Sequence, residues 1–262
     1  MSSLTDLQPL VRAVGSGDVD AGILSDEEVH WIGPDPTAPP DGFIDAPRLA
    51  GLSSHDQQVA LQAALLILQA RGDVLYERDE DVYKAVGGHA LLSHVRNAPQ
   101  AAASVRVDTR GQGTTRAAVY RVRSDLFLVE EVAEAGLHHF VFRSAPRTAR
   151  WLAATVDPHG RAGPIGPALT AANVDDLDPH PQYLADTCET SAFVYYDSRH
   201  SDGHSAQRSF TCYAGTDGVY VLAGWQTPSD GQVTLQLLPA GDLLGFCAAF
   251  LSPSGDTAPS SN

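Results

Sequence analysis

The sequence predicts an α+β protein built from two antiparallel four-stranded meanders, each followed by a helix and related to the other by a pseudo-twofold axis. The spacing of apolar residues changes from a helical to an alternating period after residue 101. The order of four strands and a helix then occurs twice along the chain. The N-terminal helices are expected to pack on the first meander. With 262 residues, 43% of them apolar, the chain can bury a sizeable core.

Residues 1–52 are predicted to form an N-terminal segment and a proline-rich linker. A short helix is expected near residues 4–14, followed by a loop rich in glycine and aspartate. Ser25, which precedes three acidic residues, is typical of a helix start because its hydroxyl can cap the first turn. Residues 33–48 hold five prolines, so an extended linker is expected there.

The clearest helix is predicted over residues 53–71, and Gly72 is expected to end it. Its apolar arc is wide, which indicates burial on two sides. Two shorter helices are predicted at residues 79–86 and 89–96. One face of the long helix carries Val59, Ala63, Leu66 and Ala70.

The first unit, residues 53–158, is completed by a meander and a helix that begins near Pro146. A connector follows at residues 159–190, with one possible short helix at residues 168–174. The second unit spans residues 191–253, and residues 254–262 are expected to be a disordered tail. The strands of the first meander are predicted at residues 104–108, 116–123, 126–132 and 137–143.

The two units align with each other in sequence order. At a constant offset Gly136 falls on Gly231, and further upstream Val105 falls on Val194. Because element order and turn residues agree, we predict a structural duplication. The alternative is that strand and helix patterns resemble each other by chance.

The net charge of −15 argues against binding to nucleic acid or to an anionic membrane, because both repel an acidic surface. No apolar segment is long enough to cross a bilayer, and the N-terminus does not resemble a signal peptide. The three cysteines form no Cys-x-x-Cys motif, so neither a disulfide framework nor a zinc site is expected. We therefore expect a soluble cytoplasmic protein.

The sequence contains no recognisable catalytic or nucleotide-binding motif, and we assign no catalytic residue, metal site or cofactor. His200 and His204 are interpreted as solvated loop residues. Adjacent strand residues point to opposite faces, so Glu130 and Glu131 are interpreted as edge or surface charges. The cysteines are expected to be buried and inert. These features favour a binding role over an enzymatic one.

A protein partner is the expected ligand. Aromatic and histidine side chains on strands serve as anchors for a partner where a sheet face or edge stays open. The candidate partner-binding residues are Phe127, His138, His139, Tyr220 and Trp225.

Two segments resemble a known family. The long helix ends in Leu68-Gln-Ala-Arg71-Gly72, and the last helix begins in Leu237-Leu-Pro239-Ala240-Gly-Asp-Leu243-Leu244. Over residues 53–251 the layout is similar to the EspG proteins of type VII (ESX) secretion in actinobacteria. That resemblance implies a cytosolic chaperone with a pseudo-twofold α/β fold that binds secreted PE–PPE pairs. The connector is shorter than in that family, and no partner-binding residue is carried over.

The leading hypothesis is a non-catalytic protein-binding module, such as a cytosolic chaperone or adaptor for secreted substrates. One alternative is a small-ligand-binding protein or a hydrolase with a cleft between the two halves, using His138 or His139 with Glu130 or Asp197. Another is an immunity-type protein whose acidic surface binds a basic toxin. The identity of the partner and the oligomeric state stay open at this stage.

Overall fold

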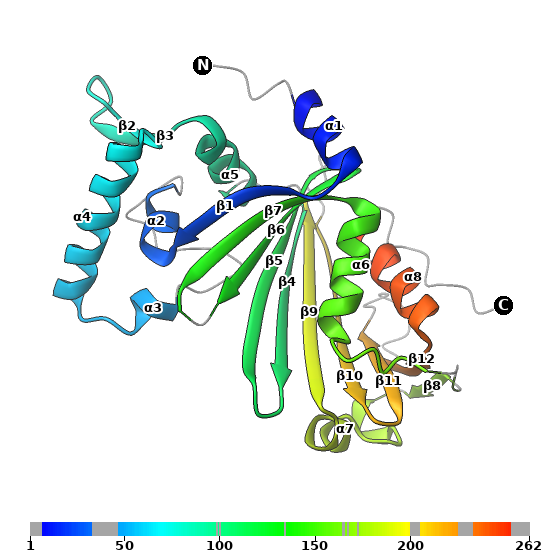
Figure 1. Ribbon diagram of the computed structural model, residues 1–262. Helices are drawn as coiled ribbons and strands as arrows, with labels where there is room; N and C mark the ends of the chain where they lie inside the picture. The colour runs from blue at the N-terminus through cyan, green and yellow to red at the C-terminus, as the bar shows by residue number, and fades with distance from the viewer. Residues whose placement is uncertain are drawn as a thin grey trace. The chain divides into compact units, whose positions relative to one another are not determined.

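The protein has a mixed α+β fold, as predicted, and its chain divides into two compact units. Unit 1 comprises Met1–Gln100 and Ala117–Arg143, and unit 2 comprises Ala101–Arg116 and Ser144–Asn262. Figure 1 shows the elements of both units. The structure is a computed structural model that describes residues 7–32, 47–97, 99, 101–133, 135–163, 166, 168–171, 173–199, 205–224 and 233–252.

Unit 1 combines helices with an antiparallel sheet and a separate hairpin. Its sheet strands are hydrogen-bonded in the order β1-β7-β6-β5, while β2 pairs only with β3. The elements in chain order are α1 (Gln8–Ser16), β1 (Val19–Ser25), α2 (Asp26–Trp31), α3 (Pro47–Ala50), α4 (Ser54–Arg71), β2 (Val74–Glu77), β3 (Val82–Ala85), α5 (Gly87–Asn97), most of β5 (Gly113–Arg123), β6 (Leu126–Ala133) and β7 (Leu137–Ser144).

The N-terminal segment contributes a strand that the sequence did not predict. Strand β1 occupies the expected loop and pairs with β7, with Leu24 opposite His138. The start of α2 is confirmed as a capping box, in which the Ser25 hydroxyl accepts a hydrogen bond from the Glu28 amide and the Glu28 carboxylate accepts one from the Ser25 amide. The proline-rich residues 33–46 lie outside the described ranges.

Helix α4 has the predicted bounds, and Gly72 ends it with a left-handed φ of 77°. The predicted helix at residues 79–86 is wrong, since the chain forms the β2–β3 hairpin there. Apolar and aromatic residues on both arms of the hairpin outweigh the acidic helix-start signal, with Tyr76 opposite Tyr83. Asp81, with a φ of 55°, allows the turn.

Unit 2 is a sheet with two helices, α6 and α8, that pack against each other. Its strands are hydrogen-bonded in the order β4-β9-β10-β11-β12-β8. In its core Phe210 of β10 packs edge-on against Phe246 and Phe250 of α8, with ring centroids 5.0 and 4.7 Å apart. The elements are β4 (Ala101–Thr109), the start of β5, α6 (Ala145–Val156), β8 (Ala168–Ala171), the 3₁₀ turn η1 (Val174–Asp176), α7 (Pro181–Thr187), β9 (Thr190–Arg199), β10 (Ser205–Gly215), β11 (Gly218–Gly224), β12 (Val233–Leu238) and α8 (Ala240–Leu251).

The connector has more structure than the sequence suggested. The possible helix at residues 168–174 is instead the short strand β8, in which Leu169 lies opposite Leu235 of β12. Helix α7 was not predicted, although Pro181 occupies its first turn and the His180 side chain caps it by accepting a hydrogen bond from Gln182. Residues 253–262 lie outside the described part of the chain.

The strands and the closing helix of each predicted meander are found in the predicted order. Strand β4 turns directly into β5, with the Gln112 amide donating to the Thr109 carbonyl. Within unit 2, β4 pairs antiparallel with β9, and Val105 lies opposite Val194. The sequence alignment of the two halves also places Val105 on Val194. A twofold axis that passes between these two residues would therefore exchange β4 with β9. The duplication itself stays a prediction.

Candidate functional site

Four of the predicted partner-binding residues lie in the described part of the chain, three of them in unit 1 and Tyr220 in unit 2. Phe127 and His138 are only 2% and 1% exposed, so neither offers a surface to a partner. The His139 side chain is 37% exposed and lies 3.3 Å from the Asp20 carboxylate, measured from its Nε2. Trp225 lies outside the described residues.

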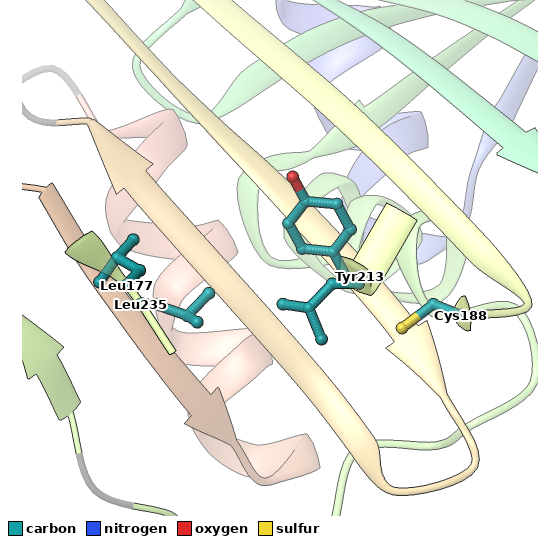
Figure 2. Close-up of a cluster of buried hydrophobic side chains, with 5 residues drawn as sticks. Leu177, Cys188, Tyr213 and Leu235 are labelled. Atoms are coloured by element: carbon teal, nitrogen blue, oxygen red, sulfur yellow. The ribbon is translucent and has the colours of Figure 1, made fainter. Parts of the chain in front are cut away.

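Tyr220 belongs to an apolar cluster in unit 2. Residues of the connector and α7 pack there against residues of β10 and β12, and Figure 2 shows Leu177, Cys188, Tyr213 and Leu235 from this cluster. Tyr220 is partly buried against the cluster, together with Leu169, Ala171, Leu222 and Val233. The side chain therefore helps to hold the connector on the sheet.

His138 is the centre of a buried ionic network in unit 1. Its Nδ1 lies 2.6 Å from a Glu130 oxygen, and its Nε2 lies 2.6 Å from an Asp26 oxygen. Two carboxylates can only be bound by a ring that donates from both nitrogens, so the imidazole is positively charged. Burial opposes that charge, but the hydrogen bonds to Asp26 and Glu130 outweigh burial and raise the pKa of His138.

Glu130 anchors the other side of this network. The Arg96 guanidinium reaches its two oxygens at 2.9 and 3.2 Å, and the Tyr120 hydroxyl donates to it at 2.8 Å. Burial alone would raise its pKa, yet the charge of Arg96 and the bond from His138 lower the pKa of Glu130 to about 2. The expectation that Glu130 is an edge or surface charge is wrong, because the residue is fully buried.

Asp26 connects the network to the N-terminal elements. Its carboxylate accepts hydrogen bonds from the Arg48 amide at 2.8 Å and the Leu49 amide at 3.3 Å, at the start of α3. Its own amide donates to the Gly136 carbonyl at 2.9 Å. Burial raises the pKa of Asp26, but the bond to His138 and the two amides lower it overall.

The buried network contains two cations, Arg96 and His138, and two anions, Asp26 and Glu130, so its charges cancel. Each of these four side chains forms a hydrogen bond with another of them. A general base needs a free nitrogen or oxygen within reach of the substrate. His138 has neither a free ring nitrogen nor an exposed surface. The arrangement suits a structural network that holds α2, α3, α5 and three sheet strands together.

The network should give the protein a defined pH dependence of stability. Charged His138 makes its full contribution to the free energy of unfolding below pH 6.5. This contribution is lost as the pH rises through the raised pKa of His138 in the folded state. Stability from Asp26 and Glu130 is complete above about pH 4.5 and is lost as the pH falls towards their lowered pKa values. The contribution of the network should therefore be greatest between about pH 4.5 and 6.5.

Urea unfolding of the wild type and of His138→Asn at pH 5.5 and pH 9 checks this prediction. The wild type should lose more unfolding free energy between the two pH values than the variant. A direct measurement is the NMR titration of His138, whose pKa should lie above 6.5. A pKa below that value would contradict the proposed charge state.

The three cysteine thiols are also buried. Cys188, Cys212 and Cys247 are free thiols, and burial raises the pKa of Cys247 to about 12. A thiol with such a pKa stays protonated at neutral pH and is a poor nucleophile. Within the described ranges, no group of three or more His, Cys, Asp or Glu residues is placed to hold a metal ion. His200 and His204 are outside those ranges.

Exposed apolar side chains instead concentrate on α4 and the β2–β3 hairpin. Twelve large apolar residues of the described chain are exposed, and seven of them lie in these two neighbouring elements. The two elements contact each other, and Figure 1 shows the hairpin at the C-terminal end of α4. The seven residues are Val59, Leu66, Ile67, Leu75, Tyr76, Val82 and Tyr83.

Helix α4 is buried on one side only. Leu65 and Leu68 are buried, and the Trp31 indole of α2 donates a hydrogen bond to the Leu61 carbonyl at 2.6 Å. On its other side Val59 is 54% and Leu66 is 66% exposed, so the prediction of burial on two sides is wrong. We call the exposed row the α4 stripe, and it consists of Val59, Ala63, Leu66 and Ala70.

The hairpin extends this apolar area with aromatic rings. Val74 is buried and anchors the hairpin, while the rings of Tyr76 and Tyr83 lie 5.1 Å apart on exposed strands. Tyr83 also contacts Trp31 edge-on at 5.8 Å. We call the α4 stripe, Ile67 and the exposed residues of the hairpin the α4–hairpin surface.

Sequence reasoning missed this surface, although a signal was present. Between Asp56 and Arg71 the helix carries no charged residue, which is unusual for a face in water. A charge-free run with a wide apolar arc is equally typical of a helix enclosed by its own chain. Only the structure distinguishes the two situations.

Comparisons with known proteins do not assign the chain to a family. No protein-family model matches it, and no curated protein matches it. Within the described residues, no helix is both long and apolar enough to span a membrane.

Proposed function

We propose that this chain is a non-catalytic protein-binding module that uses the α4–hairpin surface to hold its partner. The observation that carries the proposal is the concentration of exposed apolar residues on two adjacent elements. Monomeric proteins rarely expose such contiguous apolar areas unless they bind something there. We further propose that the chain acts in the cytoplasm as a chaperone or adaptor for secreted substrates, as the resemblance to EspG proteins implies.

The partner that fits best is an amphipathic helix. The α4 stripe repeats at intervals of four and three residues, which is the spacing at which one helix accepts the side chains of another. The turn of the hairpin adds acidic groups at Asp79, Glu80 and Asp81, all exposed. A partner with an apolar face and basic residues near one end would complement both features.

A capture experiment with matched variants tests this function. The tagged wild-type chain, expressed in its native cytosol, should retain a partner in stoichiometric amount. Leu66→Glu and Leu75→Glu should each reduce retention at least about tenfold, because a charge would be buried in an apolar contact. Intact-mass analysis of the captured complex gives the stoichiometry.

Tyr183→Glu is the control, because Tyr183 of α7 is 61% exposed but lies in unit 2. This variant should retain the partner as the wild type does. If the wild type retains no stoichiometric partner, or if the control loses it equally, the α4–hairpin surface is not the binding site.

A further inference from the structure

We propose that α4 pairs antiparallel with α4 of a second copy of this chain, so that a homodimer covers the α4 stripe while no partner is bound. This inference rests on the proposed function, because the pairing would regulate access to the same surface. The self-complementary pattern of the stripe carries the inference.

The stripe alternates large and small side chains. Val59 and Leu66 are large, and Ala63 and Ala70 between and after them are small. In an antiparallel pair centred between positions 63 and 66, Leu66 faces Ala63 of the partner subunit. In the same register Val59 faces Ala70 of the partner subunit, so every layer pairs one large residue with one small residue. Such layers interdigitate evenly.

A parallel pair would fit less well. It would place Leu66 against the same residue of the other copy, and Ala63 against its own counterpart, which leaves gaps at the alanine layers. The ends of the helix also favour the antiparallel arrangement. In that arrangement the positive N-terminal end of each helix dipole lies beside the negative C-terminal end of the other.

The pairing would bury no charged side chain between the two ends of α4. Between Asp56 and Arg71 no charged residue lies on α4, and Val59, Leu66 and Ile67 are each more than half exposed. In this register residues 58–71 of the two helices overlap, which gives a contact about 21 Å long. Alanines in the stripe allow the two helix axes to approach to about 8 Å.

A size-swap experiment tests the arrangement without any partner. Sedimentation velocity of the purified full chain over a range of concentrations should show a monomer–dimer equilibrium. Ala63→Leu should weaken the dimer by overpacking, and Leu66→Ala should weaken it by leaving a cavity, each at least about tenfold. The double variant Ala63→Leu/Leu66→Ala should recover most of this loss, because each new leucine then faces a new alanine of the other copy.

Each outcome has a defined meaning. A wild type that stays monomeric at sub-millimolar concentration overturns the proposal, and a tighter dimer in Ala63→Leu overturns the antiparallel arrangement. All these positions are exposed in the single chain, and circular dichroism checks that the variants remain folded. Tyr183→Ala, in unit 2, should leave the dimer unchanged.

The dimer and the proposed function can fail separately. Leu75→Glu should lose the captured partner but keep the dimer, because Leu75 lies on the hairpin and not on α4. Partner capture without self-association would contradict the dimer alone. Self-association without any captured partner would contradict the binding function alone.

Discussion

Replacing Glu130 by alanine should lower the free energy of unfolding by about 3–5 kcal/mol, the usual cost of removing one partner from a buried ion pair. Glu130 is fully buried, and its carboxylate accepts hydrogen bonds from Arg96, Tyr120 and His138. Without it, the Arg96 guanidinium loses its carboxylate partner in the interior. Urea unfolding at pH 6 measures the change.

Glu131→Ala is the matched control for this prediction. Glu131 is the next residue on β6, and its side chain is 35% exposed, with Arg143 at 3.4 Å. A partly exposed ion pair such as Glu131–Arg143 contributes at most about 1 kcal/mol to the free energy of unfolding. If both variants lose similar amounts of stability, the network around His138 does not hold unit 1 together.

Replacing Gly136 by alanine should cost about 2–5 kcal/mol of unfolding free energy, from left-handed backbone strain and overpacking together. Its φ is 72°, a conformation that L-residues rarely adopt. A Cβ at this position would lie 2.8 Å from the Arg48 Cβ and 2.8 Å from an Asp26 oxygen. The methyl group would therefore push Asp26 away from His138.

Gly72→Ala separates backbone strain from the clash. Gly72 has a similar φ of 77°, but a Cβ there would meet nothing within 4 Å. This control should cost only about 1–2 kcal/mol. The pKa of His138 in Gly136→Ala is a second measurement, and it should fall as the contact with Asp26 weakens. Equal losses of stability in the two variants would contradict the close packing at Gly136.

Local signals in the sequence predicted most of the elements. The cap at Ser25, the glycine after α4 and the alternating strands of both meanders are short-range features, and the structure has them in place. The errors occurred where tertiary pairing decides the conformation. Residues 79–86 carry a helix-start signal, but the strand formed by Val82 and Tyr83 finds a partner in β2.

The candidate site was harder to predict, because burial depends on what covers each face of a sheet. Strand β6 begins with Leu126, Phe127, Leu128 and Val129, an unbroken apolar run that is typical of a strand covered on both faces. Reading Phe127 as an exposed anchor overlooked this run. Glu130 and His138 lie only eight residues apart on neighbouring strands, and the hydrolase alternative paired them. The other members, Arg96 and Asp26, come from distant parts of the chain, so no spacing rule could have predicted the complete network.

Four consecutive side chains at the start of α2 all take part in contacts within unit 1. Ser25 and Glu28 begin the helix, Asp26 binds His138, and Glu27 lies 3.2 Å from the Arg48 guanidinium. A substitution at any position of this tetrapeptide would therefore remove a contact within the protein. Variation that adapts unit 1 to different ligands would have to accumulate at exposed positions, and Val59, Leu66 and Leu75 of α4 and its hairpin are among them.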